Sequence, residues 1–187
     1  MFDRLREDVR TALAKDPAAT SAITVALLYP GLHAVWGYRI AHALWERGFE
    51  FPARALSQFV RLLTGVEIHP AADIGRRLFI DHGAAVVVGE TADIGDDVLM
   101  YHGVTLGGDS MRREKRHPTL EDGATVGANS TLIGDIVVGE NATVGAGSVV
   151  VEDVPADTTV AGSPAEPVDG TGSARVSSED ADALECE

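Results

Sequence analysis

An aliphatic residue recurs at every sixth position of this chain from residue 68 onward. The two runs consist of Ile68, Ile74, Ile80, Val86, Ala92, Val98 and Val104, then Leu120, Val126, Leu132, Val138, Val144, Val150 and Ala156. A period of six matches neither the 3.6-residue repeat of an amphipathic helix nor the two-residue alternation of a strand. It is typical of a hexapeptide coil, in which three short strands and three turns close a triangular rung. The sequence therefore predicts a mainly β fold, a left-handed parallel β-helix with these residues inside.

The remainder of the chain predicts a small α-helical domain in front of the β-helix. Within residues 1–65, apolar residues recur at spacings of three and four, and prolines and glycines separate four segments, the second closed by Pro30 and Gly31. We assign residues 66–165 to the β-helix, with an extruded loop at 107–119 where the repeat is lost for more than one rung. Residues 166–187, rich in acidic and small residues, are expected to form a disordered acidic tail.

The charge of the chain restricts its partners and its medium. The net charge is −14, from 29 acidic and 15 basic residues, and only Lys15 and Lys115 are lysines. Such a surface fits a protein kept soluble at high salt, where self-repulsion is screened, although an ordinary acidic mesophilic protein also fits. We therefore hypothesise a halophilic source. Without a basic stripe to neutralise phosphates, no nucleic-acid partner is expected.

Cysteine usage and hydropathy indicate a soluble cytoplasmic protein. Cys186 is the only cysteine, which excludes a disulfide framework and a thiolate metal cluster. Residues 1–10 are charged and lack a secretory apolar core, and the longest apolar run, at 22–28, is too short to cross a bilayer. We therefore expect no membrane association.

Histidines beside carboxylates mark the candidate chemistry. Glu67 and His82 lie fifteen residues apart, close to one turn of three hexapeptides, and equivalent residues on adjacent rungs stack about 4.8 Å apart. A carboxylate near an imidazole orients the ring and stabilises its protonated form, as a general base requires. Histidines in turns are more often simple surface residues, so the spacing alone leaves both interpretations open.

Several segments together carry a family resemblance. They are Glu67-Ile-His-Pro-Ala-Ala, Ile80-Asp-His-Gly, Val88-Gly-Glu-Thr-Ala, Gly103-Val-Thr-Leu-Gly-Gly, Arg116-His-Pro-Thr, Ile133-Gly-Asp-Ile-Val-Val-Gly, Gly145-Ala-Gly-Ser-Val-Val and Ala161-Gly-Ser-Pro-Ala. With these segments the chain resembles the serine acetyltransferases, hexapeptide-repeat enzymes that acetylate L-serine from acetyl-CoA on the way to cysteine. The resemblance covers residues 16–165. Hexapeptide repeats occur in many acyltransferases, but the Asp-His pair, the Gly-Val-Thr-Leu-Gly-Gly run and the Arg-His-Pro loop are far more specific in combination.

The resemblance implies a role for individual residues. His82 matches the catalytic base of the family, and Glu67 stands in the place of its acidic partner, where many members have aspartate. Asp16 and Asp81 match acids that bind the serine substrate, and Arg116 and His117 match residues that hold the serine carboxylate. The small residues expected to line the CoA groove are Gly107, Gly108, Ala128 and Ala146, since a larger side chain would block a pantetheine channel.

The mechanism implied is direct acyl transfer, with acetyl-CoA as co-substrate and without a metal ion. The chain lacks the upstream extension that pairs trimers into hexamers in the long members of the family. The resemblance therefore implies a homotrimer with active sites between neighbouring prisms, and a hexamer is the alternative. The resemblance also implies L-cysteine as a feedback inhibitor. The chain ends Ala-Leu-Glu-Cys-Glu where the family has a terminal isoleucine that docks the sulfhydrylase, so no stable complex with that enzyme is expected.

Other functions remain open at this level. The cations Arg112, Arg113, Lys115 and Arg116 of the loop are suited to CoA phosphates, and a solvated loop with one functional arginine is an equally good interpretation. A related O-acetyltransferase acting on a sugar or another small alcohol would share the fold and the base. A trimeric β-helical zinc hydratase would need three converging histidines, for which His69, His82, His102 and His117 are the candidates. A non-catalytic scaffold would leave the histidine segments unexplained.

Overall fold

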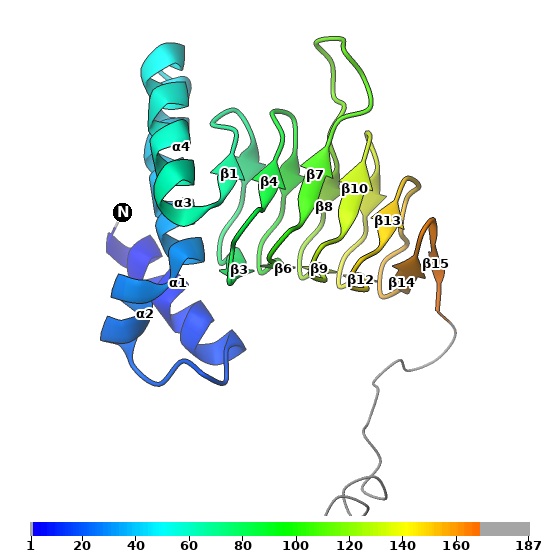
Figure 1. The fold of residues 1–187 in the computed structure, drawn as a ribbon, viewed down its shortest axis with the longest axis horizontal. Helices are drawn as coiled ribbons and strands as arrows, with labels where there is room; N and C mark the ends of the chain where they lie inside the picture. The colour runs from blue at the N-terminus through cyan, green and yellow to red at the C-terminus, as the bar shows by residue number, and fades with distance from the viewer. Residues whose placement is uncertain (1, 169–187) are drawn as a thin grey trace, which may run out of the picture.

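The computed structural model describes residues 2–168, and it confirms a left-handed parallel β-helix preceded by helices (Figure 1). The helices are α1 (Phe2–Lys15), α2 (Ala22–Leu28), α3 (Pro30–Trp45) and α4 (Glu50–Thr64). We expected Pro30 to lie between two helices. The structure instead makes it the first residue of α3, where its fixed φ and missing N–H carry no penalty. Helix α4 ends at Gly65, whose φ of 74° is the left-handed conformation that glycine adopts readily.

Three sheets form the faces of the prism. Sheet A contains β1 (Glu67–Ile68), β4 (Val87–Val88), β7 (Thr105–Gly107), β10 (Thr131–Ile133) and β13 (Val149–Val150). Sheet B contains β2 (Asp73–Ile74), β5 (Asp93–Ile94), β8 (Thr119–Leu120) and β11 (Val137–Val138). Sheet C contains β3 (Phe79–Asp81), β6 (Leu99–Tyr101), β9 (Thr125–Val126), β12 (Thr143–Val144), β14 (Thr159–Gly162) and β15 (Ala165–Pro167). All these pairs are parallel except β14 with β15, the return strand.

The chain passes from sheet C to sheet A through one set of turns and from sheet A to sheet B through another. We call the first set the C–A edge, which consists of residues 82–86, 102–104, 127–130 and 145–148. The second set is the A–B edge, which consists of residues 69–72, 89–92, 108–118 and 134–136. The long loop at 108–118 is the green excursion beside β7 in Figure 1. The two edges lie at opposite ends of the strands of sheet A.

The aliphatic repeat is not continuous, which corrects the sequence-based interpretation. Glu67 pairs with Val87, a rung of 20 residues, whereas Val87 pairs with Thr105, a rung of 18. The two additional residues lie in the turn at 82–86, which the pattern did not reveal. In each rung segment two residues, two positions apart, face the interior, as Val86 and Val88 do. A shift of two residues therefore moves the aliphatic repeat from one inward position to the other, and the predicted residues stay buried.

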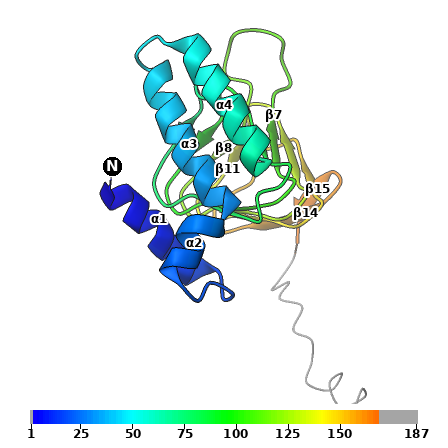
Figure 2. The same ribbon diagram turned by 60° about the vertical axis from the view of Figure 1, so that its left-hand side comes forward.

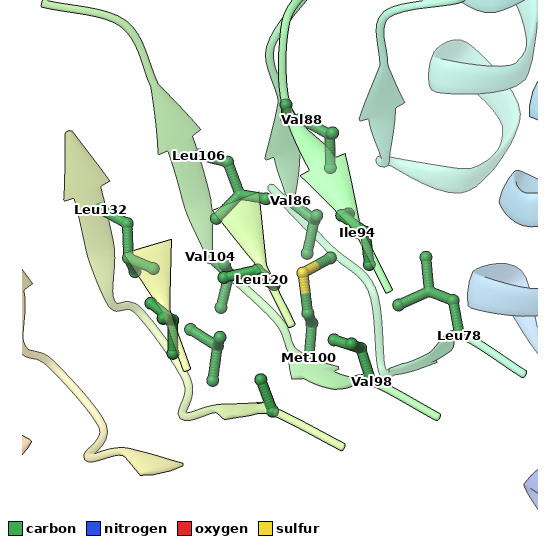
Figure 3. Close-up of a cluster of buried hydrophobic side chains, with 14 of the residues drawn as sticks. Leu78, Val86, Val88, Ile94, Val98, Met100, Val104, Leu106, Leu120 and Leu132 are labelled. Atoms are coloured by element: carbon green, nitrogen blue, oxygen red, sulfur yellow. The ribbon is translucent and has the colours of Figure 1, made fainter. Parts of the chain in front are cut away.

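The last rung also differs from the prediction. Thr143 pairs with Thr159, a rung of only 16 residues, and Ala156 is exposed. Val154 and Val160 occupy the interior there. The other residues of the repeat are buried apart from Ile74, which is partly exposed. These residues, of which Figure 3 labels Leu132 among others, form one continuous column together with Met100 and Leu106.

The helices cover the first-rung end of the prism (Figures 1 and 2). Carbonyl groups of the first rung point toward them, and three helical side chains satisfy these acceptors. Ser57 Oγ donates to Ile68 O at 2.6 Å, Tyr38 Oη donates to Ala72 O at 2.6 Å, and His42 Nδ1 lies 2.9 Å from Pro70 O. Ala34, Val35 and Tyr38 of α3 belong to the same hydrophobic cluster as the prism interior. The helices and the β-helix therefore share one core.

The strand β15 reaches Pro167, two residues into the segment that we expected to be a tail, and most of that segment lies outside the described residues. No helix within residues 2–168 is long and apolar enough to span a bilayer.

Candidate active site

His82 occupies the enlarged turn of the C–A edge. Its φ is 61°, and its side chain is 75 % exposed. The Nε2 atom lies 3.8 Å from Asp81 Oδ2, and the ring stands nearly perpendicular to that of His102 on the next rung, with centroids 6.0 Å apart. The two additional residues of this turn thus present an accessible imidazole beside a carboxylate.

Asp16, which follows α1, belongs to the same group. Its Oδ2 accepts a hydrogen bond from Tyr29 Oη at 2.5 Å, and its Oδ1 accepts one from Ala18 N at 2.7 Å. These bonds lower the pKa of Asp16, and the carboxylate raises the pKa of Tyr29 to about 12, so the acid is ionised and the phenol protonated at neutral pH. His82 also contributes to the lowered pKa of Asp16, and Asp81 contributes to the raised pKa of Tyr29. Sequence reasoning missed Tyr29, because a contact across thirteen residues leaves no local pattern.

An ion-pair cluster holds α1, and with it Asp16, against the prism. Glu7 accepts hydrogen bonds from both Arg76 and Arg77, and Arg77 also pairs with Asp97 at 2.7 Å. Lys15 Nζ donates to the carbonyl oxygen of Asp97. Because Lys15 directly precedes Asp16, this last contact holds the acid close to the prism.

Glu67 lies on the same side of the prism as His82 but contacts other partners. Its backbone N–H donates to Val86 O, at the end of the His82 turn. Its carboxylate lies 3.0 Å from Arg61 Nη1 and 3.4 Å from Gln58 Nε2. Among the residues described, no ion pair joins Glu67 to His82. The expected dyad is therefore close in the fold, but its two side chains are not in contact here.

Arg116 and His117 lie on the A–B edge, at the base of the extruded loop. Arg116 Nη2 donates to Glu90 Oε2 at 2.5 Å, and this bond lowers the pKa of Glu90. His117 is 8 % exposed, and its Nδ1 accepts a hydrogen bond from Thr91 N at 3.2 Å. Burial lowers the pKa of His117, and the charge of Arg116 lowers it further. The site therefore pairs a guanidinium with a neutral imidazole.

The remaining cations of the loop fall into two classes. Lys115 Nζ donates to Asp93 at 2.6 Å and to the carbonyl oxygen of Thr91. No ion pair within residues 2–168 engages Arg112 or Arg113. Arg113 lines an open cleft of about 610 Å³ between the loop and the helices, together with Trp45 and Met111. Of the four loop cations, Arg112 and Arg113 are thus the two that form no ion pair within the described residues.

The small residues expected to line the CoA groove divide between the two edges. Gly107 ends β7 and Gly108 begins the A–B edge, where a Cβ at Gly108 would come within 3.1 Å of His117 Nε2. Ala128 and Ala146 lie at the C–A edge on consecutive rungs, joined by the bond from Gly147 N to Ala128 O. The residues suited to serine divide in the same way. Asp16, Asp81 and His82 are on one side, and Arg116 and His117 are on the other.

The histidines considered for zinc do not converge. His82 and His102 lie at the C–A edge, whereas His69 and His117 lie at the A–B edge. Burial lowers the pKa of His69 to about 4, and its Nδ1 accepts a hydrogen bond from Ala71 N. Residues 2–168 contain no group of three or more histidine, cysteine or acidic side chains arranged to hold a metal ion.

Comparisons with known proteins agree on one family. A family model described as bacterial transferase hexapeptide (six repeats) matches residues 117–151. The serine acetyltransferase of Helicobacter pylori is 53 % identical over 164 residues, which cover 88 % of this chain and 96 % of the relative. The structure of the Neisseria gonorrhoeae serine acetyltransferase in complex with serine aligns with a TM-score of 0.86 and 42 % identity, over 89 % of this chain and 68 % of that one. The Brucella abortus serine acetyltransferase in complex with coenzyme A aligns with a TM-score of 0.88 and 39 % identity, over 91 % and 68 %.

Proposed function

This chain belongs to the serine acetyltransferase family and transfers an acetyl group from acetyl-CoA to L-serine, and we propose that His82 is the general base of a direct transfer. The observation that carries this role is the exposed imidazole on the enlarged turn, beside Asp81 and within the electrostatic reach of Asp16. His82 removes the proton of the serine hydroxyl as that oxygen attacks the thioester carbonyl. The tetrahedral intermediate collapses, the C–S bond breaks, and the departing thiolate takes the proton back.

Opposite charges fix the orientation of the substrate. Asp16 and Asp81 bind the serine ammonium group, and Arg116 and His117 bind its carboxylate. Glu67 acts as the acidic partner of His82, which requires its carboxylate to leave Arg61 and turn toward the imidazole. Gly107, Gly108, Ala128 and Ala146 line the pantetheine channel, and Arg112 and Arg113 attract the CoA phosphates. Positioning both substrates in one groove supplies much of the rate, up to about 7–11 kcal/mol in favourable systems.

The separation of the two edges supports a homotrimer with shared sites. Serine is too small to reach from the C–A edge to the A–B edge of one chain. A closed threefold arrangement brings the C–A edge of one chain against the A–B edge of the next and completes three equivalent sites. Helix α4 ends just before β1 and carries three exposed apolar residues, Phe59, Leu62 and Leu63. These residues extend the proposed contact surface. A hexamer is the alternative, and measurement of the molar mass separates the two.

Two inactive variants are expected to restore activity to each other. In mixed trimers of His82→Ala and Arg116→Ala chains, about a quarter of the sites combine an intact C–A edge with an intact A–B edge. Serine-dependent thiol release should therefore return when the two chains are assembled together. The matched control is a mixture of His82→Ala and Asp81→Ala, which carry both lesions on the same edge and should stay inactive. Equal recovery in the two mixtures would contradict a shared site.

The acceptor is tested by thiol release from acetyl-CoA with L-serine, homoserine and a simple galactoside in parallel, in molar KCl and in dilute buffer. We expect release with serine, at a higher rate in KCl because salt screens the repulsion within a chain of net charge −14. Release with the galactoside alone would transfer the chain to the sugar O-acetyltransferases. A higher rate in KCl would support the proposal that this enzyme works in a halophilic cytoplasm.

Regulation follows from the same site. L-Cysteine has the ammonium and carboxylate groups of serine, so we propose that it binds between the two edges and inhibits the enzyme.

A further inference from the structure

Thr91 contacts three consecutive residues at the base of the extruded loop. It lies in the A–B turn that follows β4, next to Glu90. Its carbonyl oxygen accepts a hydrogen bond from Lys115 Nζ at 2.7 Å, and its Oγ1 accepts one from Arg116 N at 3.0 Å. Its own N–H and Oγ1 lie 3.2 and 2.9 Å from His117 Nδ1. One residue thus fixes the segment that carries both proposed ligands of the serine carboxylate.

These contacts determine where His117 carries its proton. A backbone amide can only donate, so the Thr91 N–H, 3.2 Å from Nδ1, favours an unprotonated Nδ1. The hydroxyl of Thr91 already accepts the N–H of Arg116, and its own proton is therefore free to point at the same Nδ1. Two donors converge on one acceptor, and a neutral imidazole in this position holds its proton on Nε2.

The Nε2 atom of His117 lies over two glycines of the chain, near the side chain of Arg116. A Cβ at Gly89 would lie 2.1 Å from His117 Nε2, and one at Gly108 would lie 3.1 Å away, so the ring packs over two glycines. No hydrogen bond from another side chain or backbone group within residues 2–168 engages Nε2. This donor is therefore left for a ligand beside the guanidinium of Arg116.

We propose that Thr91 is a positioning residue that holds His117 in the Nε2–H tautomer, so that His117 gives the serine carboxylate a neutral hydrogen bond while Arg116 supplies the charge. This inference rests on the proposed role of His117 in binding serine. In the other tautomer the lone pair of Nε2 would face the carboxylate and repel it. The neutral ring also avoids placing a second cation beside Arg116, which is already paired with Glu90.

The test compares Thr91→Val, which removes the hydroxyl and keeps the shape, with Thr91→Ser, which keeps the hydroxyl. A hydrogen bond to a charged group is typically worth about 10-fold or more in binding, so Thr91→Val should raise the KM for serine about 10-fold. The KM for acetyl-CoA should stay within about twofold, and Thr91→Ser should restore the KM for serine. An unchanged KM for serine, or an equal rise in both KM values without recovery in Thr91→Ser, would overturn the proposal.

A second measurement needs only the wild-type enzyme. The ¹⁵N shifts of the His117 ring should show an unprotonated Nδ1 and a protonated Nε2 at neutral pH. In Thr91→Val the shorter hydroxyl contact is lost and only the 3.2 Å backbone contact to Nδ1 remains, so the population of the other tautomer should rise. A protonated Nδ1 in the wild type would refute the inference even if the variants fail to fold. Failure of the proposed function would look different, because the wild type would then release no thiol with serine while the tautomer stayed as described.

Discussion

Replacing His82 with alanine is expected to lower kcat at least about 10²-fold, because the serine hydroxyl would lose the group that takes its proton in the transition state. The KM values should change much less, since the ammonium and carboxylate ligands of serine remain. The side chain is largely exposed, so the variant should fold normally. Steady-state thiol release with saturating L-serine and acetyl-CoA measures the effect.

His102 supplies the matched control. It lies on the next rung with its ring nearly perpendicular to that of His82, and its Nδ1 is buried without a hydrogen-bond partner in the described chain. His102→Gln should keep kcat within about threefold, because most substitutions away from the reacting atoms have small effects. If His102→Gln lost activity and His82→Ala kept it, the base would be assigned to the wrong histidine.

Gly31→Ala is expected to lower the free energy of unfolding by more than about 3 kcal/mol, as large steric conflicts in a packed interior do. A Cβ at this position of α3 would lie 2.0 Å from the carbonyl oxygen of Ile80. Backbone cannot move aside as a side chain can, so α3 would have to withdraw from β3. Because β3 leads directly into Asp81 and His82, kcat should fall as well. Denaturant unfolding monitored by circular dichroism gives the stability.

Gly37→Ala in the same helix is the control for helix propensity. A Cβ there would meet Cγ2 of Val60 at 2.4 Å, a contact that rotation of a partly buried side chain can relieve. Gly37→Ala gains about 1 kcal/mol of helix propensity and Gly31→Ala, in the first turn of α3, gains at most that much, so a large difference between them reports the steric term. We expect Gly37→Ala to stay within about 1.5 kcal/mol of the wild type. Equal stability of the two variants would show that α3 does not depend on its close approach to Ile80.

The fold was predictable because a period of six has few structural solutions, but the register was only partly so. Ile80 and Val98 are buried on either side of a shift that the pattern could not reveal, because two positions of each short strand segment face inward. Ala156 shows the opposite case. It keeps the period, but a shortened last rung places Val154 and Val160 inside and leaves Ala156 exposed.

The candidate site was predictable to the extent that its residues lie in recognisable segments. Their grouping was not, because the sequence does not show that Arg116 and His82 lie on different edges of one prism. Tyr29 and Thr91 were also missed as partners. The bond between Tyr29 and Asp16, and the bonds between Thr91 and the loop, join residues that the period of six does not relate.

The three hydrogen bonds that Ser57, Tyr38 and His42 make to the first rung have a consequence for polymerisation. A β-helix with a bare end offers a row of unpaired carbonyls to which another copy can add, and repeated addition leads to fibrils. Here hydroxyl and imidazole groups occupy those acceptors, and the helices cover them. Chains blocked from stacking end to end can still associate side by side, and the proposed trimer would be a closed ring of this kind and not an open filament.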